Sequence, residues 1–281
     1  MTTSPSARGR VSLVGAGPGD PELMTRKAWS RLMQAELVLV DEPVDRRILA
    51  ELPSGTRVLQ VGKRGGCVST EQGFIHGLMI RSARQGLRVV RLKGGDPFIF
   101  GRGGEEMDAL LAAGVEVEVI NGLSAGLAGP ASVGIAVTDR RCAPGVALVT
   151  GHNGEGGHAP DWAALARSGL TLVVYMGVSR CSEIVKALMD GGLAADTPAA
   201  VVCSAHTEQQ QQAWTQLAGL PALLATEGLG SPAVLVIGAA AGMALDRQLR
   251  PQLAAPARAG LCQAAGAQEL EPVCAAGARS W

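Results

Sequence analysis

The sequence predicts an α/β fold made of two α/β domains. Short runs rich in β-branched residues alternate with longer amphipathic stretches, which is the pattern of mostly parallel strands joined by helices. The alternation breaks once, in a segment rich in Gly, Ala, Ser and Pro at residues 121–145, and then resumes. A chain of 281 residues is long enough for one large domain or two modest ones, and the break favours two.

The first series runs from the N-terminus to this break. Five short apolar runs are expected to be strands, at residues 11–15, 37–41, 57–61, 88–92 and 116–120. Three amphipathic stretches between them are expected to be helices, at residues 24–35, 71–85 and 104–113. The second of these helices follows Ser69 and Thr70, which are favourable N-caps, and ends before Gly86, a favourable residue after a helix.

A second series of strands and helices follows the break, at residues 146–150, 161–167, 171–176, 179–190, 199–203 and 233–237. We therefore expect an N-terminal domain at 10–122, a linker at 123–144 and a C-terminal domain at 145–241. Residues 242–281 are rich in Ala, Gly, Pro, Arg and Gln without a period, and such a composition buries too little apolar area to order a chain. We expect this tail and residues 1–9 to be disordered.

Charge and composition exclude several classes of partner. The 25 basic and 25 acidic residues cancel, and aromatic residues make up only 3% of the chain, so neither nucleic acid nor a membrane surface is expected to bind. The N-terminus lacks an apolar signal segment, and no stretch is long and apolar enough to span a membrane. The six cysteines contain no C-x-x-C pair and the four histidines are scattered, which favours free thiols in the cytoplasm and no metal site.

The first apolar run ends in a glycine turn, VSLVGAGPGD at residues 11–20. A glycine turn after a strand allows a ligand to approach the main chain closely. A dinucleotide-binding enzyme would carry an acid about twenty residues further on, and Asp41 follows Gly19 by 22 residues. However, Asp20 and Pro21 stand where such an enzyme has its third glycine, and Pro18 stiffens the turn. The turn alone leaves both a ligand loop and an ordinary tight turn open.

A denser glycine segment, RLKGGDPFIFGRGGEE, occupies residues 91–106 directly after an expected strand. Glycines at this density weaken a fold and usually give a ligand access to the backbone. Asp96 is able to accept hydrogen bonds from hydroxyl or amine groups, and Arg102 is able to clamp a carboxylate with two hydrogen bonds. A glycine-rich surface loop is the alternative that the residues alone leave open.

Six segments together resemble the uroporphyrinogen-III C-methyltransferases, in the tetrapyrrole methylase class of S-adenosylmethionine (SAM) enzymes: GAGPGDPELMT, VGKRGG, RLKGGDPFIFGRGGEE, NGLSAGLAG, TLVVYMGV and SPAVLVIG. The resemblance runs in order from about residue 11 to residue 239. It implies two α/β domains, SAM in the cleft between them and a homodimer. It also implies methylation of C2 and C7 of uroporphyrinogen III to precorrin-2 via precorrin-1, feeding sirohaem, cobalamin or haem d1 synthesis, without a metal.

The resemblance also implies roles for individual residues. Asp41 is the implied proton acceptor and Lys63 the implied proton donor. Arg102 is implied both in catalysis and in binding the polycarboxylate substrate, together with Glu105 and Arg140. The implied SAM-binding residues are Pro18, Gly94, Gly95, Asp96, Ile99, Ser124, Ala125, Met176 and Ala205. For Glu105, stabilisation of the helix that follows is the alternative, and for Met176 it is core packing.

The chain departs from the family pattern at several positions. Glu42 in the DEPVD run replaces a usual Arg, Asp139 replaces a frequent His, and NGLSA replaces P-G-I-T-A. Glu42 puts a negative charge where a substrate carboxylate would approach, so a sister methylase for another precorrin-type tetrapyrrole is the main alternative. A nicotinamide-dependent oxidoreductase leaves LKGGDP unexplained. A non-enzymatic binding homologue would be favoured by loss of Asp41, Asp96 and Arg102, and all three are present.

Overall fold

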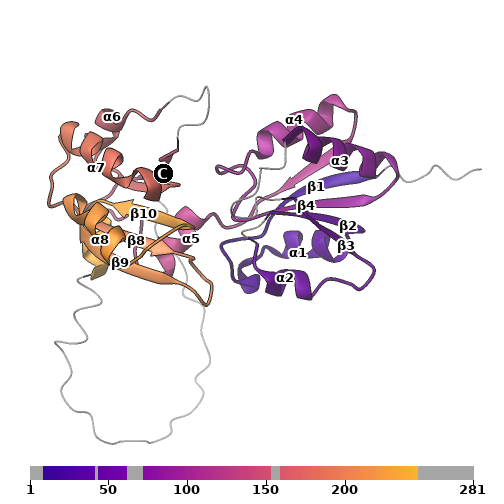
Figure 1. Cartoon of the computed structure of the whole chain (residues 1–281), viewed down its shortest axis with the longest axis horizontal. Coiled ribbons are helices and arrows are strands. Elements are labelled where there is room, and N and C mark those ends of the chain that lie inside the picture. Colours follow the sequence, from indigo (N-terminus) through magenta and orange to yellow (C-terminus); the bar gives the residue numbers. More distant parts are fainter. Residues whose placement is uncertain (1–8, 42–43, 62–71, 153–158, 246–281) are drawn as a thin grey trace, which may run out of the picture.

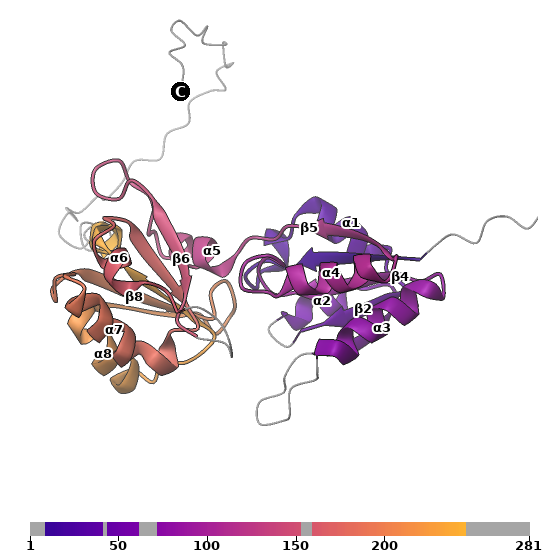
Figure 2. The same ribbon diagram turned by 90° about the horizontal axis from the view of Figure 1, so that it is seen from above.

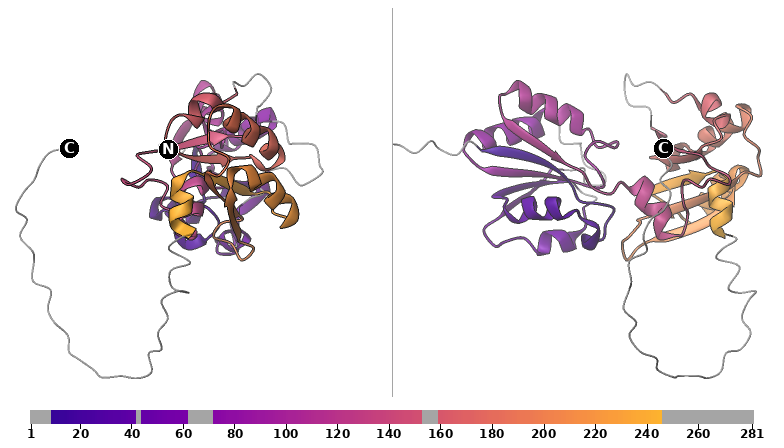
Figure 3. Two further views of the ribbon diagram at one scale, coloured as in Figure 1. Left: turned by 90° about the vertical axis from the view of Figure 1, so that its left-hand side faces the viewer. Right: turned by 180° about the vertical axis from the view of Figure 1, so that it is seen from behind.

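The computed structural model describes residues 9–41, 44–61, 72–152 and 159–245. Two α/β halves lie side by side, each built around a five-stranded sheet (Figure 1). The view from above shows a narrow connection from the first half into the second at the level of α5 (Figure 2). The view from behind in Figure 3 shows the same arrangement, with α5 at the boundary between the halves. The two predicted α/β units are therefore both present.

The first half is a parallel sheet with strand order β3-β2-β4-β1-β5. Helices α3 and α4 cover one face and α1 and α2 cover the other (Figure 1). Because all five strands are parallel, their carboxyl ends meet at one edge, which is where α/β sheets bind ligands. The elements are β1 (Arg10–Gly15), η1 (Pro21–Leu23), α1 (Arg26–Met33), β2 (Leu37–Val40), α2 (Arg46–Ala50), β3 (Arg57–Gln60), α3 (Gln72–Arg84), β4 (Arg88–Lys93), α4 (Gly103–Ala112) and β5 (Glu116–Ile120).

Alternating residues of the central strands fill two separate cores. Leu39 and Val89 face α3 and α4, where they pack in a cluster with Met79 and other buried side chains. Val38 and Val90 face the other side of the sheet and pack in the cluster that contains α1. Strands that are buried on both faces read as continuous apolar runs, and this is why the sequence located them well.

The second half has strand order β6-β7-β10-β8-β9. Only β6 and β7 pair in parallel, and the other three pairs are antiparallel, so the expectation of mostly parallel strands holds for the first sheet and not for the second. The elements are α5 (Ala125–Ser132), β6 (Val146–Thr150), α6 (Trp162–Ala166), β7 (Thr171–Tyr175), η2 (Val178–Arg180), α7 (Cys181–Asp190), β8 (Pro198–Cys203), β9 (Gln211–Gln216), η3 (Leu217–Gly219), α8 (Leu220–Thr226) and β10 (Ala233–Ile237).

Two segments differ from what the composition predicts. Residues 123–144, expected as a linker, contain α5, and Val133, Ile135 and Ala143 are buried in the cluster that includes β8 and β10. Residues 242–245, expected in the disordered tail, belong to a helix at 239–245. The second difference has a physical reason, because Ala240, Ala241 and Ala244 pack on the same core at helical spacing. The first arises because Val133 and Ile135 supply apolar area to that core. The remaining residues of both expected disordered ends, 1–8 and 246–281, lie outside the described part.

Three cysteines in the described part, Cys142, Cys181 and Cys203, are free thiols, and the other three lie outside it. The same described part contains no group of three or more His, Cys, Asp or Glu side chains arranged to hold a metal ion. No helix of this described part is both long enough and apolar enough to cross a bilayer.

Candidate functional site

Three glycine turns meet at the carboxyl edge of the first sheet, after β1, β4 and β5. The amide of Gly17 donates to the carbonyl of Gly95 at 3.2 Å, and the amide of Gly95 donates back to the carbonyl of Gly17 at 2.8 Å. Both residues have positive φ, +77° and +66°, which glycine adopts without strain. A Cβ on Gly15 would lie 2.5 Å from both the Gly122 amide and the Gly95 carbonyl oxygen. Glycine at these positions therefore lets the three turns touch.

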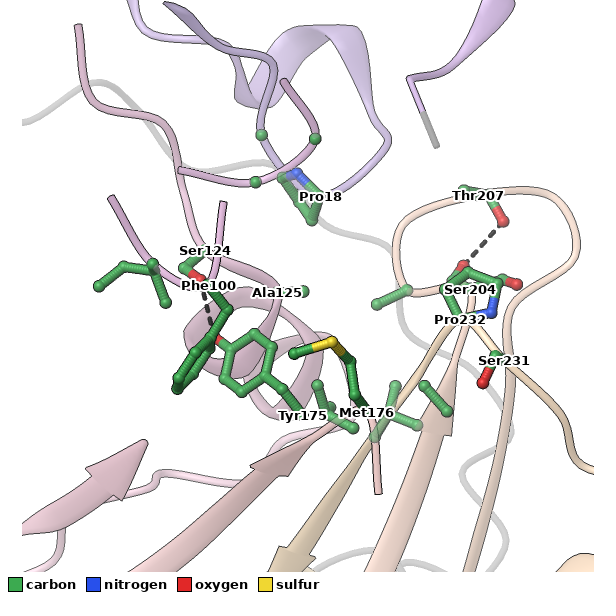
Figure 4. Close-up of a pocket in the computed structure, with 18 of the residues that line it drawn as sticks. Pro18, Phe100, Ser124, Ala125, Tyr175, Met176, Ser204, Thr207, Ser231 and Pro232 are labelled. Atoms are coloured by element: carbon green, nitrogen blue, oxygen red, sulfur yellow. Dashed lines mark hydrogen bonds between the residues drawn. The ribbon is translucent and has the colours of Figure 1, made fainter. Parts of the chain in front are cut away.

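A cavity of about 440 Å³ opens beside these turns, with walls from both halves (Figure 4). The first half supplies the turns after β1 and β4, and the second supplies α5 and the ends of β7, β8 and β10. The volume lies within the roughly 300–1,000 Å³ typical of small-molecule sites. All nine predicted cofactor residues line it: Pro18, Gly94, Gly95, Asp96, Ile99, Ser124, Ala125, Met176 and Ala205.

The two halves are in contact on one side of this cavity. A Cβ on Gly19, in the first turn, would lie 2.7 Å from Thr207 Cγ2 and 3.1 Å from the carbonyl oxygens of Ala205 and His206. Residues 204–210 connect β8 with β9, and Thr207 Oγ1 donates to the Ser204 carbonyl at 2.7 Å, which closes this connection on itself (Figure 4). The absence of a side chain at Gly19 thus allows the second half to approach the turn.

The buried carboxylate of Asp96 ties two of the three turns together. Its Oδ1 accepts from the Phe98 amide at 2.8 Å. Its Oδ2 accepts from Asn121 Nδ2 and from the Gly122 amide, both at 3.1 Å. Three protein donors therefore hold the carboxylate that the sequence assigned to a ligand, and its first role is to fix the cavity wall.

Tyr175, at the end of β7, lines the cavity and was missed from the sequence. Its hydroxyl accepts from the Gly126 amide at 2.6 Å and shares a second hydrogen bond of 2.6 Å with Ser124 Oγ. Figure 4 shows the ring between Ser124, Phe100 and Met176, and its centroid is 4.8 Å from that of Phe100. Burial, more than any other cause, raises the pKa of Tyr175, so the phenol stays protonated near neutral pH.

Non-glycine residues with left-handed backbone gather around the cavity. Met176 and Ser204 line it with φ of +52° and +46°, and Phe100 does so with φ of +53°. Such φ values are uncommon for these residue types and mark sites where the surroundings hold the backbone in place. The Met176 side chain is 47% exposed and points into the cavity (Figure 4), so the alternative of core packing does not describe it.

The predicted substrate and catalytic residues that the structure describes, Asp41, Arg102, Glu105 and Arg140, do not line this cavity. Arg102, the N-cap residue of α4, binds Glu105 in the first turn of that helix, at 3.0 Å between Nε and Oε1 and 2.5 Å between Nη2 and Oε2. The hydrogen bond from Arg102 is the largest cause that lowers the pKa of Glu105. Arg140 is exposed in the turn before β6 and shares no hydrogen bond or ion pair with either of them in the described part.

Asp41 lies at the end of β2, beside two cations of β4. Arg91 Nη2 is 2.5 Å from one of its carboxylate oxygens, and Lys93 Nζ is 3.5 Å from the other. Lys93 directly precedes Gly94 of the cavity wall, so Asp41 is paired with the last residue of the strand that leads into the cavity. Lys63 and Glu42 lie outside the described residues.

The site is therefore a concave cavity lined largely by backbone and small side chains, with separate charged groups at the same edge of the sheet. Backbone amides and carbonyls in such a wall can form many hydrogen bonds with a polar small molecule. Cations at the ends of strands can attract acidic groups of a second molecule. The arrangement suits a reaction between two bound molecules.

The comparisons with known proteins agree on one family. Residues 10–221 match the family model of Tetrapyrrole (Corrin/Porphyrin) Methylases. The uroporphyrinogen-III C-methyltransferase of Pseudomonas aeruginosa is 52% identical over 230 residues, which are 82% of this chain and 93% of the relative. The siroheme synthase of Chromobacterium violaceum is 45% identical over 82% of this chain, which spans 49% of that longer protein.

Solved structures give the same result. The uroporphyrin-III C-methyl transferase from Thermus thermophilus, solved in complex with S-adenyl homocysteine, has a TM-score of 0.71 and 42% identity. The match covers 84% of this chain and all of that one.

Proposed function

Because the chain belongs to the tetrapyrrole (corrin/porphyrin) methylases, we propose that it methylates uroporphyrinogen III at C2 and C7 with SAM, giving precorrin-1 and then precorrin-2. The names of its relatives support this substrate, with identities of 40–52% to four bacterial uroporphyrinogen-III C-methyltransferases. The observation that carries the proposal is the convergence of nine predicted cofactor residues, from five separate segments, on one cavity.

The cavity wall fits SAM in size and in chemistry. It is backed by the Gly95 and Gly122 turns, where side chains are excluded, so main-chain groups of residues 94–96 are accessible to the ligand. Pro18 forms one side, Tyr175 and Met176 form another, and Ser204 and Thr207 close the cavity from the second half. When bound, SAM supplies an electrophilic methyl group on its sulfonium. The chain's own contribution is to hold both reactants in line, which lowers a barrier by several kcal/mol.

The substrate is a polycarboxylate, so the proposal assigns cations to its recognition. Arg102 is the exposed N-cap residue of α4 and ends the loop that supplies Gly94, Gly95 and Ile99 to the cavity. Glu105 accepts two hydrogen bonds from Arg102, and a substrate carboxylate would compete for the same N–H groups. Arg140 and Lys63 are proposed as further cations by family position only.

Methylation of a pyrrole carbon leaves a proton that must depart from the macrocycle. We assign Asp41 as the acceptor, because its carboxylate is fixed between two cations and still reaches solvent. Lys63 is the proposed proton donor. The proposal also includes a homodimer, a cytoplasmic location and a product that feeds sirohaem, cobalamin or haem d1 synthesis.

A sister methylase for another precorrin-type tetrapyrrole remains the second candidate, on the strength of Glu42. Arg46 and Arg47 begin α2 and are the cations that could compensate for the charge of Glu42. Arg47 pairs with Asp45 on its own turn, with 3.0 Å between Nη2 and Oδ2, so it is already engaged. Arg46 has no hydrogen bond or ion pair within the described part of the chain, which leaves it available for this role.

Incubation of the purified protein with SAM and uroporphyrinogen III tests the proposal. The expected product is precorrin-2, detected as its oxidised chromophore, with S-adenosylhomocysteine formed in a ratio of two to one. Calorimetric SAM binding without product would favour the sister methylase. Failure to bind SAM would contradict the assignment of the cavity itself.

A further inference from the structure

Four charged side chains gather at the carboxyl end of the first sheet, on the face covered by α3 and α4. Asp41 follows β2, Arg91 and Lys93 lie on β4, and Glu106 lies in the first turn of α4. Along β4, Val89, Arg91 and Lys93 share one face of the strand because side chains alternate. Val89 packs in the apolar core of this face. The charged group therefore begins where this core ends, close to the cavity.

Glu106 holds both cations through a single oxygen. Its Oε1 accepts from Arg91 Nε at 3.0 Å, from Lys93 Nζ at 3.1 Å and from Gln72 Nε2 at 3.2 Å. On their other side the same cations face Asp41, with Arg91 Nη2 at 2.5 Å from Oδ1 and Lys93 Nζ at 3.5 Å from Oδ2. Each carboxylate oxygen of Asp41 thus has its own cation, and Glu106 anchors both cations from behind.

Only one member of the group reaches solvent. The side chains of Glu106, Arg91 and Lys93 are 0%, 3% and 5% exposed, whereas that of Asp41 is 24% exposed. Two cations and two carboxylates leave the group neutral. Replacing a buried ion pair by apolar residues is often neutral or stabilising, so stability alone does not account for such a group. What distinguishes this group is that it holds the Asp41 carboxylate in a fixed orientation at the solvent boundary.

We propose that Glu106, acting through Arg91 and Lys93, is a positioning residue for the Asp41 carboxylate. The inference rests on the proposed function, in which Asp41 accepts the proton that leaves the macrocycle. Lys93 precedes Gly94 of the cavity wall, so the strand that carries the cations also sets the position of Asp41 relative to the methyl donor. Without the charge of Glu106, Arg91 is held only by Asp41 and the Leu39 carbonyl, and Lys93 only by Asp41, so the Asp41 carboxylate loses part of its alignment.

The test compares Glu106→Gln with a matched control, Glu118→Gln. Glu118 on β5 also accepts from several donors, Ser12 Oγ at 2.9 Å and Arg31 Nε at 2.5 Å, and neither donor bonds to Asp41. Glu106→Gln keeps the Oε1 acceptor and places its amide at the unpartnered Oε2 position, so it removes mainly the negative charge that holds the two cations. We expect it to lower kcat by about tenfold, less than the roughly 10²–10⁴-fold that a general base contributes, because Asp41 itself remains. The rate is counted per SAM-binding site measured by calorimetry, and KM and the SAM Kd stay within about twofold. Glu118→Gln keeps the wild-type kcat per site.

A purely structural role gives a different result. Glu106→Gln would then reduce the fraction of protein that binds SAM but leave kcat per site unchanged, and this outcome would overturn the proposal. A second comparison adds Glu106→Gln to Asp41→Asn. Because Glu106 acts through Asp41, its effect on the residual rate falls below about twofold in that background. An undiminished tenfold effect there would also overturn it.

A readout that needs no turnover separates this inference from the proposed function. The Arg91 Nε–H is buried and hydrogen-bonded, so its NMR signal is expected to exchange slowly with solvent. We expect the Arg91 Nε–H to exchange faster in both Glu106→Gln and Asp41→Asn. Its exchange rate in Glu118→Gln is expected to equal that of the wild type. If wild type binds SAM but forms no precorrin-2, the proposed function fails while this exchange still tests the network. Unchanged exchange in Asp41→Asn would show that Glu106 and Asp41 are not linked.

Discussion

A Cβ atom on Gly122 would lie 2.1 Å from the carbonyl oxygen of Gly95. This distance is far below any van der Waals contact, so the turns after β4 and β5 meet only because position 122 has no side chain. Part of the reason for so many glycines around the cavity is thus that the turns of neighbouring strands pack too closely for side chains. Access for the ligand follows from the same close approach.

Gly122→Ala is expected to disrupt the cavity. The new methyl group must push the Gly95 turn away, which breaks the reciprocal hydrogen bonds between Gly17 and Gly95. We expect a loss of at least 2 kcal/mol in the free energy of unfolding, about the penalty of overpacking a rigid site, and loss of SAM binding by calorimetry. Gly104→Ala is the control, because a Cβ there meets nothing within 4 Å and alanine favours the helix. Equal behaviour of the two variants would contradict the packing argument.

Asp96→Asn is expected to be nearly as harmful as Asp96→Ala. Oδ2 accepts from two N–H donors, so an asparagine Nδ2 in its place would face two donors and leave both without an acceptor. In the opposite side-chain orientation, Nδ2 would face the backbone N–H of Phe98. We predict SAM binding weakened by about tenfold or more, with a lower midpoint of thermal unfolding. Calorimetry and a thermal scan measure the two effects. Wild-type SAM affinity in Asp96→Asn would mean that the carboxylate does not hold the turns.

Tyr175→Phe removes one oxygen that serves two partners. The Gly126 amide and the Ser124 hydroxyl both lose their bond to it, and unpaired buried polar groups cost about 1–3 kcal/mol each. We expect SAM binding to weaken several-fold and the free energy of unfolding in urea to fall by about that range. Ser124→Ala should have a smaller effect, since it leaves the Gly126 amide satisfied. A larger effect of Ser124→Ala would assign the main role to the serine.

Arg102→Ala is expected to abolish turnover while SAM binding survives, because Arg102 is proposed to bind the substrate and lies outside the cavity lining. Glu105→Gln is the informative companion. It releases Arg102 from its present partner, so we expect KM for uroporphyrinogen III to fall. Steady-state kinetics measures both. Loss of SAM binding in Arg102→Ala would place the residue on the cofactor side instead.

Alkaline pH is expected to lower the free energy of unfolding through Cys181, which is buried in the second half. Burial raises the pKa of its thiol from 9.0 to about 11. The unfolded thiol ionises from about pH 9 while the folded thiol keeps its proton up to about pH 11, so stability from this group is present below that window and lost across it. The loss is about 2–3 kcal/mol. Urea unfolding at about pH 8 and about pH 10.5 should show a smaller decrease for Cys181→Ala than for wild type. The raised pKa of Cys203 leaves part of the decrease in both proteins.

The first sheet could be predicted strand by strand, and the second only in part. Strand β2 is a continuous apolar run, and β1 and β4 carry short runs of Val and Leu, so sequence reasoning located all three. Strand β9, with the sequence QQAWTQ, was missed because it is a polar edge strand with several exposed positions. Without β9, no hairpin was expected, and the antiparallel character of the second sheet stayed hidden.

Sequence reasoning likewise found some residues of the candidate site and missed others. Motif-bearing residues such as Gly95 and Met176 were found because glycines and matched segments mark them. Glu106 was missed because one carboxylate in a helix looks like a solvated surface charge, and only the fold brings it to Arg91 and Lys93. Tyr175 was missed although it precedes Met176, because nothing in the segment reveals that its hydroxyl turns back to Ser124. Partners distant in sequence are fixed by tertiary packing alone.

The contact between Gly19 and the 205–207 segment has a consequence for synthesis on the ribosome. The nascent chain emerges with its N-terminal half first, so all strands of the first sheet are available after Ile120, long before Thr207 is translated. During that interval the glycine turns have no opposing wall. The cavity is therefore complete only after translation of β8, β9 and residues 231–234, which also line it.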